Sequence, residues 1–190
     1  CRTLGAIDKK IGIKDVEAVM IRRTVDPHNS KKGPVNAIVP VIKTPTHHGI
    51  DVQTVLPHLS VFTTAVAVPT TLMHLHSITV NLKEKTDQKE VIKILENTPR
   101  VILFDSEHGF RSTADLMEFA RERGHSRSDL PEIAVWKDSI SVTGDKLRFY
   151  QAIHQESDIV PENIDAIRAM FEMMGAKESI MKTNKSLNIQ

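Results

Sequence analysis

The sequence predicts an α+β fold, in which a mixed, mostly antiparallel sheet carries helices packed on one face. Strand-like segments follow one another without an intervening helix, as at 132–136, 139–143 and 147–153. Segments with apolar residues three and four apart, typical of amphipathic helices, separate these groups. This order favours helices laid on a largely antiparallel sheet over a doubly wound parallel sheet. Neither a Gly-x-Gly-x-x-Gly motif nor a P-loop occurs in the chain.

The first half of the chain alternates short helices, strands and turns. Residues 1–12 are expected to form a helix, since Leu4, Ile7 and Ile11 share one face. The remaining elements are expected, in order, as a strand from Asp15 to Arg23, a loop from Thr24 to Pro34, a short strand from Val35 to Val41, a turn from Pro45 to Gly49, a short helix capped by Asp51 and ending at Leu56, and strands over 60–68 and 71–82 on either side of Pro69.

The second half shows clearer helix caps and one hairpin turn. Thr86 is expected to cap a helix from Asp87 to Asn97, with Glu90 placed for a reciprocal bond. The remaining elements are expected as a strand from Val101 to Phe104, a helix from Ser112 or Thr113 to Arg123 stopped by Gly124, strands over Glu132–Trp136, Ser139–Thr143 and Leu147–Ile153 with a turn at Gly144-Asp145, a helix starting at Pro161 and ending at Met174, and a last helix from Glu178 to Asn188.

Composition excludes several classes of protein. The 190 residues suit one domain, and a 40% hydrophobic share supports a core. A net charge of +1 gives no sign of a nucleic-acid or polybasic membrane surface, and no apolar run reaches the length of a membrane span. With Cys1 as the one cysteine, no internal disulfide can form, so a reducing, cytoplasmic setting is expected. Because Cys1 opens directly into a helical pattern, we expect the chain to be a fragment.

The most informative histidine is His74, in the apolar run from Val66 to His76. A buried histidine must find partners for both ring nitrogens or lose about 1–3 kcal/mol. It is also the side chain that exchanges protons near neutral pH. His74 is therefore a candidate general base, although, on its own evidence, a hydrogen-bonded core histidine is the commoner outcome.

Four further groups could carry chemistry. Arg22 and Arg23 end a strand, where both guanidinium groups can converge on an anion, or simply face solvent. His47 and His48 can hold phosphate or a metal, although an exposed loop pair is the commoner outcome. His74 and His76 form an H-x-H pair, but no further ligand has a spacing that demands a metal. The segment from His154 to Asp158 joins a strand to a helix, and its carboxylates suit helix capping.

Together, seven segments resemble the archaeal-type (class II) phosphorylating glyceraldehyde-3-phosphate dehydrogenases: MIRRTVDPH, KKGPVNAIVP, HHGIDVQTVLP, VPTTLMHLHSI, NTPRVILF, HQESDIVPENIDAIRAM and KTNKSLNI. The resemblance runs through essentially the whole chain and implies that residues 1–190 are the catalytic domain. It implies that a nucleotide-binding Rossmann domain is absent and that the C-terminal helix, about 175–190, packs on it. It also places the nucleophilic cysteine in a Ser-Cys-Asn-Thr-Thr motif upstream of Cys1, which matches a non-catalytic position.

The resemblance implies roles for six residues. His74 matches the family's catalytic histidine, beside the nucleophile. His47 and His48 match the pair assigned to the substrate phosphate, and Arg22 is expected to help. Arg23 and Gln155 match positions near the nicotinamide of the cofactor, NAD or NADP. The implied reaction oxidises D-glyceraldehyde 3-phosphate with inorganic phosphate to 1,3-bisphosphoglycerate through a cysteine thioester, in a homotetramer of glycolysis or gluconeogenesis.

Two other hypotheses for the function of this chain remain open. The isolated domain could serve as a non-catalytic assembly module, since the family forms tetramers largely through this sheet. Alternatively, His47, His48, His74 and His76 could bind a metal, which the spacing supports only weakly. The fragment by itself is expected to be inactive, since it lacks both the thiol and the dinucleotide fold.

Overall fold

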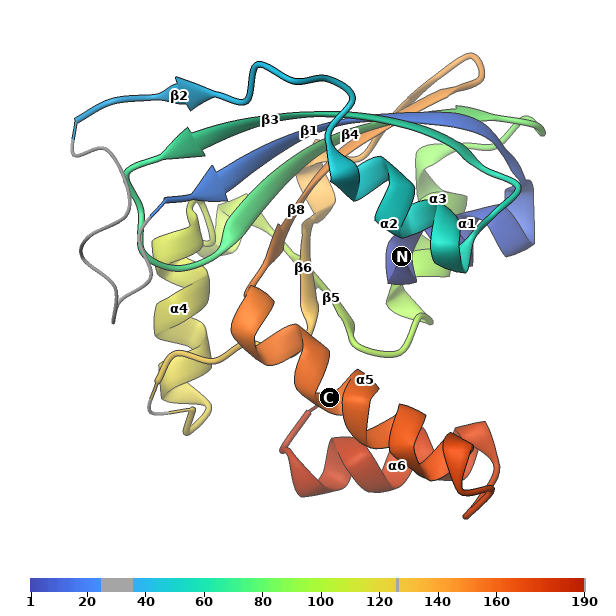
Figure 1. The fold of residues 1–190 in the computed structure, drawn as a ribbon, viewed down its shortest axis with the longest axis vertical. Helices are drawn as coiled ribbons and strands as arrows, with labels where there is room; N and C mark the ends of the chain where they lie inside the picture. The colour runs from blue at the N-terminus through green and yellow to red at the C-terminus, as the bar shows by residue number, and fades with distance from the viewer. Residues whose placement is uncertain (25–35, 126, 190) are drawn as a thin grey trace.

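The computed structural model describes residues 1–24, 36–125 and 127–189 and shows the predicted α+β architecture (Figure 1). Its elements are α1 (Arg2–Ile11), β1 (Ile13–Arg23), β2 (Val39–Pro40), α2 (His47–Val55), β3 (Ser60–Val68), β4 (His74–Leu82), α3 (Gln88–Glu96), β5 (Val101–Phe104), α4 (Thr113–Glu122), β6 (Ile133–Trp136), β7 (Ser141–Thr143), β8 (Lys146–Ile153), α5 (Gln155–Met170) and α6 (Ala176–Ser186), with short 3-10 turns η1 (Ser106–His108) and η2 (Lys137–Ser139).

The strands form one mixed sheet in the order β2-β3-β1-β4-β8-β6-β5, with β7 paired to β8. Most pairs are antiparallel, but β1 runs parallel to β3 and β5 runs parallel to β6. In the antiparallel pair of β1 and β4, Ile21 lies opposite Leu75. This register places the end of β1 beside the beginning of β4, so that Arg22, Arg23 and His74 meet at one end of the sheet.

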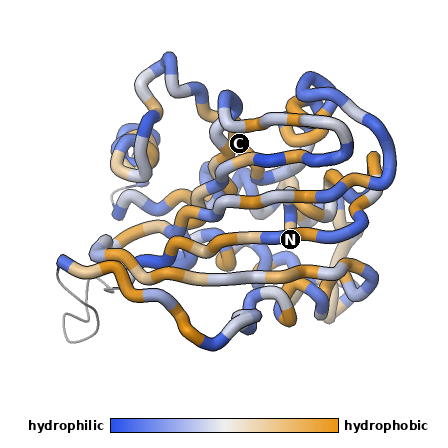
Figure 2. The backbone as a smooth tube through the Cα atoms, turned by 90° about the horizontal axis from the view of Figure 1, so that it is seen from above, coloured by the Kyte–Doolittle hydropathy of each residue, from blue (hydrophilic) through white to orange (hydrophobic). Residues whose placement is uncertain are grey.

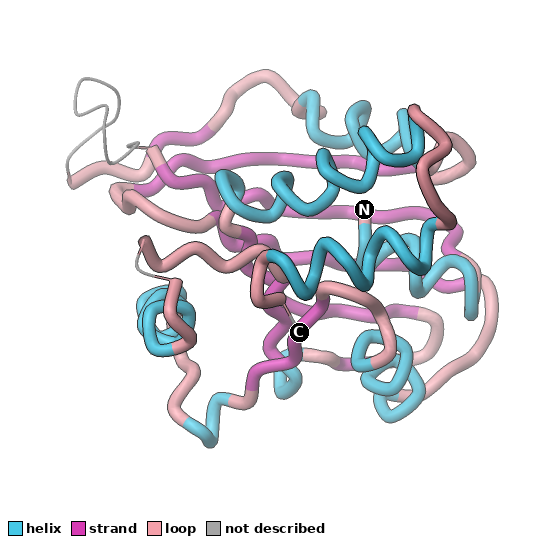
Figure 3. Tube along the Cα trace, turned by 90° about the horizontal axis from the view of Figure 1, so that it is seen from below, coloured by secondary structure: helices cyan, strands magenta, loops and turns pink. Residues whose placement is uncertain are grey.

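One face of the sheet is covered by helices and carries the larger hydrophobic core. Figure 3 shows helices lying over the strands, whereas Figure 2, from the opposite side, shows the central strands in front. Ile7 of α1, Val91 of α3 and Val80 of β4 are fully buried in this core. Apolar side chains of α1 fall three and four residues apart, as the sequence predicts, so one stripe of the helix faces the sheet.

The helices were expected on one face of the sheet, but α4 lies against the other face, beside β5 and β6. In β6, Ile133 and Val135 join the larger core, whereas Ala134 belongs to a second cluster with Leu116 and Ala120 of α4. Alternate residues of a strand point to opposite faces, so the two clusters lie on either side of β6. The second cluster also contains Phe104, Phe110 and Phe119, which pack edge to face with centroids 4.8–5.7 Å apart.

Three helices begin earlier than the sequence predicts: α2, α5 and, by two residues, α6, which begins at Ala176 rather than Glu178. The turn expected at Pro45–Gly49 is instead the start of α2, which begins at His47 after Thr46 rather than at Asp51. Similarly, α5 begins at Gln155, and Pro161 lies inside it rather than in its first turn. The carbonyl of His154 accepts from the backbone N–H groups of Ser157 and Asp158, so the helix starts directly at the end of β8.

Other boundaries shift for local reasons. Asp87, not Thr86, caps α3, because its carboxylate accepts from the backbone N–H of Glu90; the Thr86 hydroxyl instead donates to the Glu90 side chain. The strand expected over Val35–Val41 is confined to Val39–Pro40, with Val35 outside the described residues, and the loop at 25–34 also lies outside them. The Ser112 capping box and the β7–β8 hairpin at Gly144 are confirmed.

Candidate functional site

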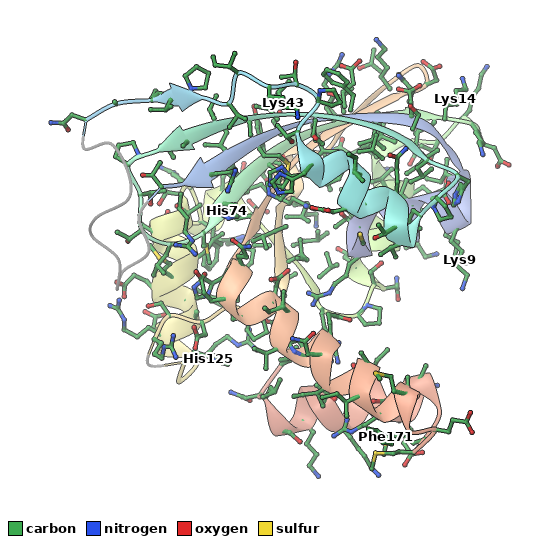
Figure 4. All side chains as sticks on the ribbon, viewed as in Figure 1. Lys9, Lys14, Lys43, His74, His125 and Phe171 are labelled. Carbon is green, nitrogen blue, oxygen red and sulfur yellow. The ribbon has the colours of Figure 1, made fainter. Side chains whose placement is uncertain are left out.

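His74 begins β4, at the point where β1 ends and α5 begins (Figure 4). Met73, directly before it, is 2% exposed and has a φ of 64°, in the left-handed region that a side chain with a Cβ rarely adopts. Packing of Met73 in the second hydrophobic cluster holds this conformation. A strained residue held by packing commonly accompanies a functional group whose direction must be set.

Two hydrogen bonds hold the His74 ring from opposite sides. The backbone N–H of Arg23 donates to Nδ1 over 3.1 Å. Nε2 lies 2.8 Å from Oε1 of Gln155. Because a backbone N–H can only donate, Nδ1 must accept and the neutral ring carries its proton on Nε2. His74 is therefore presented as the Nε2–H tautomer, donating toward the exposed side chain of Gln155.

Burial and neighbouring charges keep His74 neutral. Burial lowers the pKa of His74 from its ordinary value, and the charges of Arg23 and Arg22 lower it further. The bond to Gln155 acts in the opposite direction and raises it. A half-buried imidazole that stays neutral at physiological pH is suited to exchange protons with a bound substrate.

The predicted pair His47 and His48 opens α2, with rings stacked at a centroid distance of 4.1 Å. His47 is exposed, with Nε2 3.9 Å from Asp51. His48 is half-buried, and its Nδ1 lies 2.9 Å from Oγ1 of Thr46, which also contacts Thr63 of β3. This chain of hydroxyls fixes the His48 ring against the sheet.

Positive potential gathers around His48. Burial lowers its pKa, and the nearby charges of His47 and Arg22 lower it further. Asp51 acts in the opposite direction and raises it, and His74 adds a smaller lowering. The first turn of α2 contains no acidic residue, so the positive end of its dipole is not neutralised there. A helix N-terminus beside a guanidinium group and two imidazoles is suited to a phosphate.

Arg23 faces Glu156 at the start of α5. The two side chains form an ion pair, and the Arg23 side chain is only 13% exposed. Arg22 follows Ile21, which pairs with Leu75 of β4, and it lies close enough to His48 and His74 for its charge to lower the pKa of both. The two arginines predicted to converge on one anion therefore have separate surroundings.

His76 is buried rather than part of a metal centre. Its Nδ1 lies 3.3 Å from Nε2 of Gln151, whose Oε1 accepts from the hydroxyl of Thr3 in α1. Burial lowers the pKa of His76 to about 3, with His74 and His48 adding to the shift. Within the described residues, no group of three or more His, Cys, Asp or Glu side chains is arranged to hold a metal ion. The structure thus gives the metal hypothesis no support.

The sequence interpretation missed Glu156 as a member of this site. The sequence pattern from His154 to Asp158 predicts helix capping, and Glu156 does lie in the first turn of α5. Its carboxylate nevertheless also contacts Arg23 of β1. The signal available was its position next to Gln155, at the end of a strand that enters a helix.

Comparison with known proteins assigns the chain to a family. Residues 1–139 match the family described as "Glyceraldehyde 3-phosphate dehydrogenase, C-terminal domain". Curated proteins named glyceraldehyde-3-phosphate dehydrogenase are similar: one from Thermococcus kodakarensis is 58% identical over 99% of this chain and 55% of its own length, and one from Methanothermus fervidus is 52% identical over 100% of this chain and 56% of its own. The chain therefore spans about half the length of these relatives.

A distant solved structure shares the fold. The crystal structure of aspartate semialdehyde dehydrogenase II from Vibrio cholerae superposes with a TM-score of 0.59 over 80% of this chain and 53% of that one. Its sequence identity of 13% supports a shared architecture and nothing finer. Among the described residues, no helix combines the length and the apolar character needed to cross a membrane.

Proposed function

The chain belongs to the glyceraldehyde-3-phosphate dehydrogenase family, and from that premise we propose that it is the catalytic domain, residues 1–190, of an NAD- or NADP-dependent phosphorylating enzyme. The whole protein oxidises D-glyceraldehyde 3-phosphate with inorganic phosphate to 1,3-bisphosphoglycerate. The aldehyde carbon loses a hydride, a cysteine outside this chain holds the acyl group as a thioester, and phosphate then replaces the thiol. The observation that carries this proposal is the neutral His74 held beside a cluster of cationic groups.

His48, His47 and Arg22 form the proposed phosphate site. His48 is anchored through Thr46, and Arg22 is close enough to lower its pKa. Binding of a doubly negative phosphate there favours protonation of His48, because an opposite charge stabilises the charged form. His47, whose side chain is exposed, can complete the site as substrate enters.

His74 is the proposed proton-transfer group, and its two nitrogens have different tasks. Nε2–H is directed at an exposed side chain, so it can instead donate to the aldehyde oxygen as that oxygen becomes negative. To act as a base, the ring must accept a proton at Nδ1, where the Arg23 N–H now donates. Base catalysis by His74 therefore requires that this backbone bond open.

Arg23 and Gln155 are proposed to lie near the nicotinamide. The Gln155 side chain is exposed, and with its oxygen bonded to His74 its NH₂ group is directed elsewhere and can donate to a carboxamide oxygen. This donor set suits the carboxamide of a nicotinamide ring. When bound, that ring supplies the hydride acceptor.

Exposed apolar side chains support the proposed assembly. Val19, Phe62 and Tyr150, on the sheet face away from α1–α3, are 41%, 47% and 46% exposed. We propose that this face takes part in a homotetramer, and that the whole protein is cytoplasmic and binds neither nucleic acid nor membrane.

At the other end of the molecule, Phe171 is 73% exposed (Figure 4). The C-terminal helix, about 175–190, is proposed to pack on the nucleotide-binding domain.

The test is NAD(P)H formation by the longest natural form of the protein, with glyceraldehyde 3-phosphate and inorganic phosphate. We expect phosphate-dependent turnover that falls about 10²–10⁴-fold in His74→Asn, in line with the loss of a proton-transfer group. A wild-type protein without turnover on either cofactor would refute the proposal and favour the assembly module. Turnover that survives the substitution would keep the enzyme and remove His74 from the mechanism.

A further inference from the structure

We propose that Glu156 is a positioning residue that, through Arg23, holds His74 as the Nε2–H tautomer. This inference rests on the proposed function, because it concerns how the proton-transfer group of that reaction is set. It is carried by a closed ring of contacts that links β1, β4 and the first turn of α5.

The ring of contacts joins two adjacent residues of α5 to both sides of one imidazole. Gln155 contacts Nε2 of His74 directly. Glu156, its neighbour, pairs with the guanidinium group of Arg23, and the backbone N–H of Arg23 donates to Nδ1 of His74. The ion pair therefore sets the separation between the two elements that hold the ring, the end of β1 and the start of α5.

Partial burial restrains the Arg23–Glu156 ion pair, which is called the brace below. The Arg23 side chain is 13% exposed and that of Glu156 is 33% exposed. Oε2 of Glu156 is buried without a hydrogen bond among the described residues, and Nε2 of His154 lies 3.7 Å from it. Nδ1 of His154 accepts from the backbone N–H of Leu130, so its Nε2 carries the proton and faces the carboxylate. Glu156 thus lies between a guanidinium group and an N–H group.

The brace also balances charge beside His74. The groups that act on the ring are Arg22 and Arg23 from β1, Gln155 from α5 and His154 at the end of β8. His48 of α2 and His76 of β4 are the neighbouring imidazoles whose pKa values His74 lowers. Arg23 and Arg22 both lower the pKa of His74. The Glu156 carboxylate offsets part of the Arg23 charge, so replacing it with an amide should lower the pKa of His74 further.

The experiment compares Glu156→Gln with wild type in the longest natural form, labelled with ¹⁵N-histidine. Nitrogen chemical shifts distinguish a protonated ring nitrogen from an unprotonated one, and the His74→Asn spectrum assigns the His74 signals. We expect His74 in wild type to be the Nε2–H tautomer. In Glu156→Gln we expect a mixture of tautomers and a lower His74 pKa, with kcat reduced about tenfold to hundredfold and KM changed much less, as for a misplaced group.

Glu162→Gln is the matched control. Glu162 lies on the same helix, but it pairs with Arg2 and Arg100 rather than with Arg23. We expect wild-type His74 signals in this variant. An unchanged tautomer and pKa in Glu156→Gln would overturn the proposal, and so would an equal change in Glu162→Gln.

Two further arms keep the outcome decisive. If Glu156→Gln does not fold, Glu156→Asp keeps the charge but shortens the side chain by one methylene group. We then expect a His74 pKa near that of wild type with a mixed tautomer, and an unchanged tautomer would overturn the brace. If wild type shows no dehydrogenase turnover while the NMR differences are as expected, the proposed function is wrong. The role of Glu156 in holding the His74 tautomer is then still supported.

Discussion

Gly49 lies so close to Val61 that a Cβ on Gly49 would be 2.5 Å from the Val61 carbonyl oxygen. Its backbone N–H also donates to Oγ1 of Thr63 over 3.1 Å. A glycine directly after His47 and His48 therefore allows α2 to approach β3 closely enough for His48 to contact the sheet. Helix α2 is held by this close approach more than by a broad apolar face, since Gly49 is its one fully buried residue.

Gly49→Ala is expected to displace the start of α2. Because the clash involves backbone rather than a flexible side chain, we expect a loss of about 1–3 kcal/mol in the free energy of unfolding, typical of overpacking. KM for glyceraldehyde 3-phosphate should rise as His48 moves. Gly5→Ala in α1 is the control: its Cβ meets no atom within 4 Å, so it should leave stability unchanged or raise it by about 0.5–1 kcal/mol. Denaturant titration and steady-state kinetics measure both effects.

Replacing Gln155 should move the His74 pKa in a direction set by the substitution. The bond from Gln155 raises that pKa, so Gln155→Leu should lower it. Gln155→Glu should raise it, because a carboxylate favours the imidazolium. Histidine must be neutral to accept a proton, so the acidic limb of kcat/KM should shift to lower pH in Gln155→Leu and to higher pH in Gln155→Glu. Shifts of the same sign in both variants would contradict the assignment of this limb to His74.

The buried His76 should make the fold sensitive to acid. Its pKa is about 3 in the folded chain, below the ordinary 6.5, so the unfolded chain binds a proton that the folded chain does not. The free energy of unfolding should therefore fall as pH decreases from about 6.5 to about 3, by up to about 1.4 kcal/mol per pH unit from this residue. His76→Gln should reduce that slope relative to wild type. Denaturation curves at several pH values measure both slopes.

Arg100 should hold the C-terminal helices to the sheet. Its side chain is 3% exposed, with Nη2 2.5 Å from Asp165 and Nη1 2.9 Å from Glu162 of α5, and its Nε donates to Asn184 of α6. Arg100→Met would leave Oδ2 of Asp165, which faces Arg100, without a counter-charge. We therefore expect a loss of about 3 kcal/mol in the free energy of unfolding.

Arg121→Ala provides the comparison for Arg100→Met. Arg121 pairs with Glu118 at the surface of α4, where both side chains are more than half exposed. Such pairs contribute about 0.5 kcal/mol. Thermal unfolding of the two variants should therefore differ clearly, and similar losses would show that the Arg100 network is not structural.

Elements governed by short-range contacts could be predicted from the sequence alone. The capping box at Ser112 closes within three residues, and the hairpin at Gly144 needs only a residue that tolerates a φ of 65°. The strand Val101–Phe104 was predicted at its observed bounds. The seven resembling segments, too, led to a family that the comparison confirms. In each case the determining chemistry lies in a few neighbouring residues.

The tertiary structure decided what distant residues do to one another. Arg23 and Glu156 are 133 positions apart, and only the pairing of β1 with β4 and β4 with β8 brings the start of α5 to Arg23. The same pairing selects the His74 tautomer and separates the surroundings of Arg22 and Arg23. Likewise, the local sequence around Gly49 predicts a turn, but in the structure Gly49 lies in α2 and packs against β3. Burial against the sheet overrides the preference of glycine for turns.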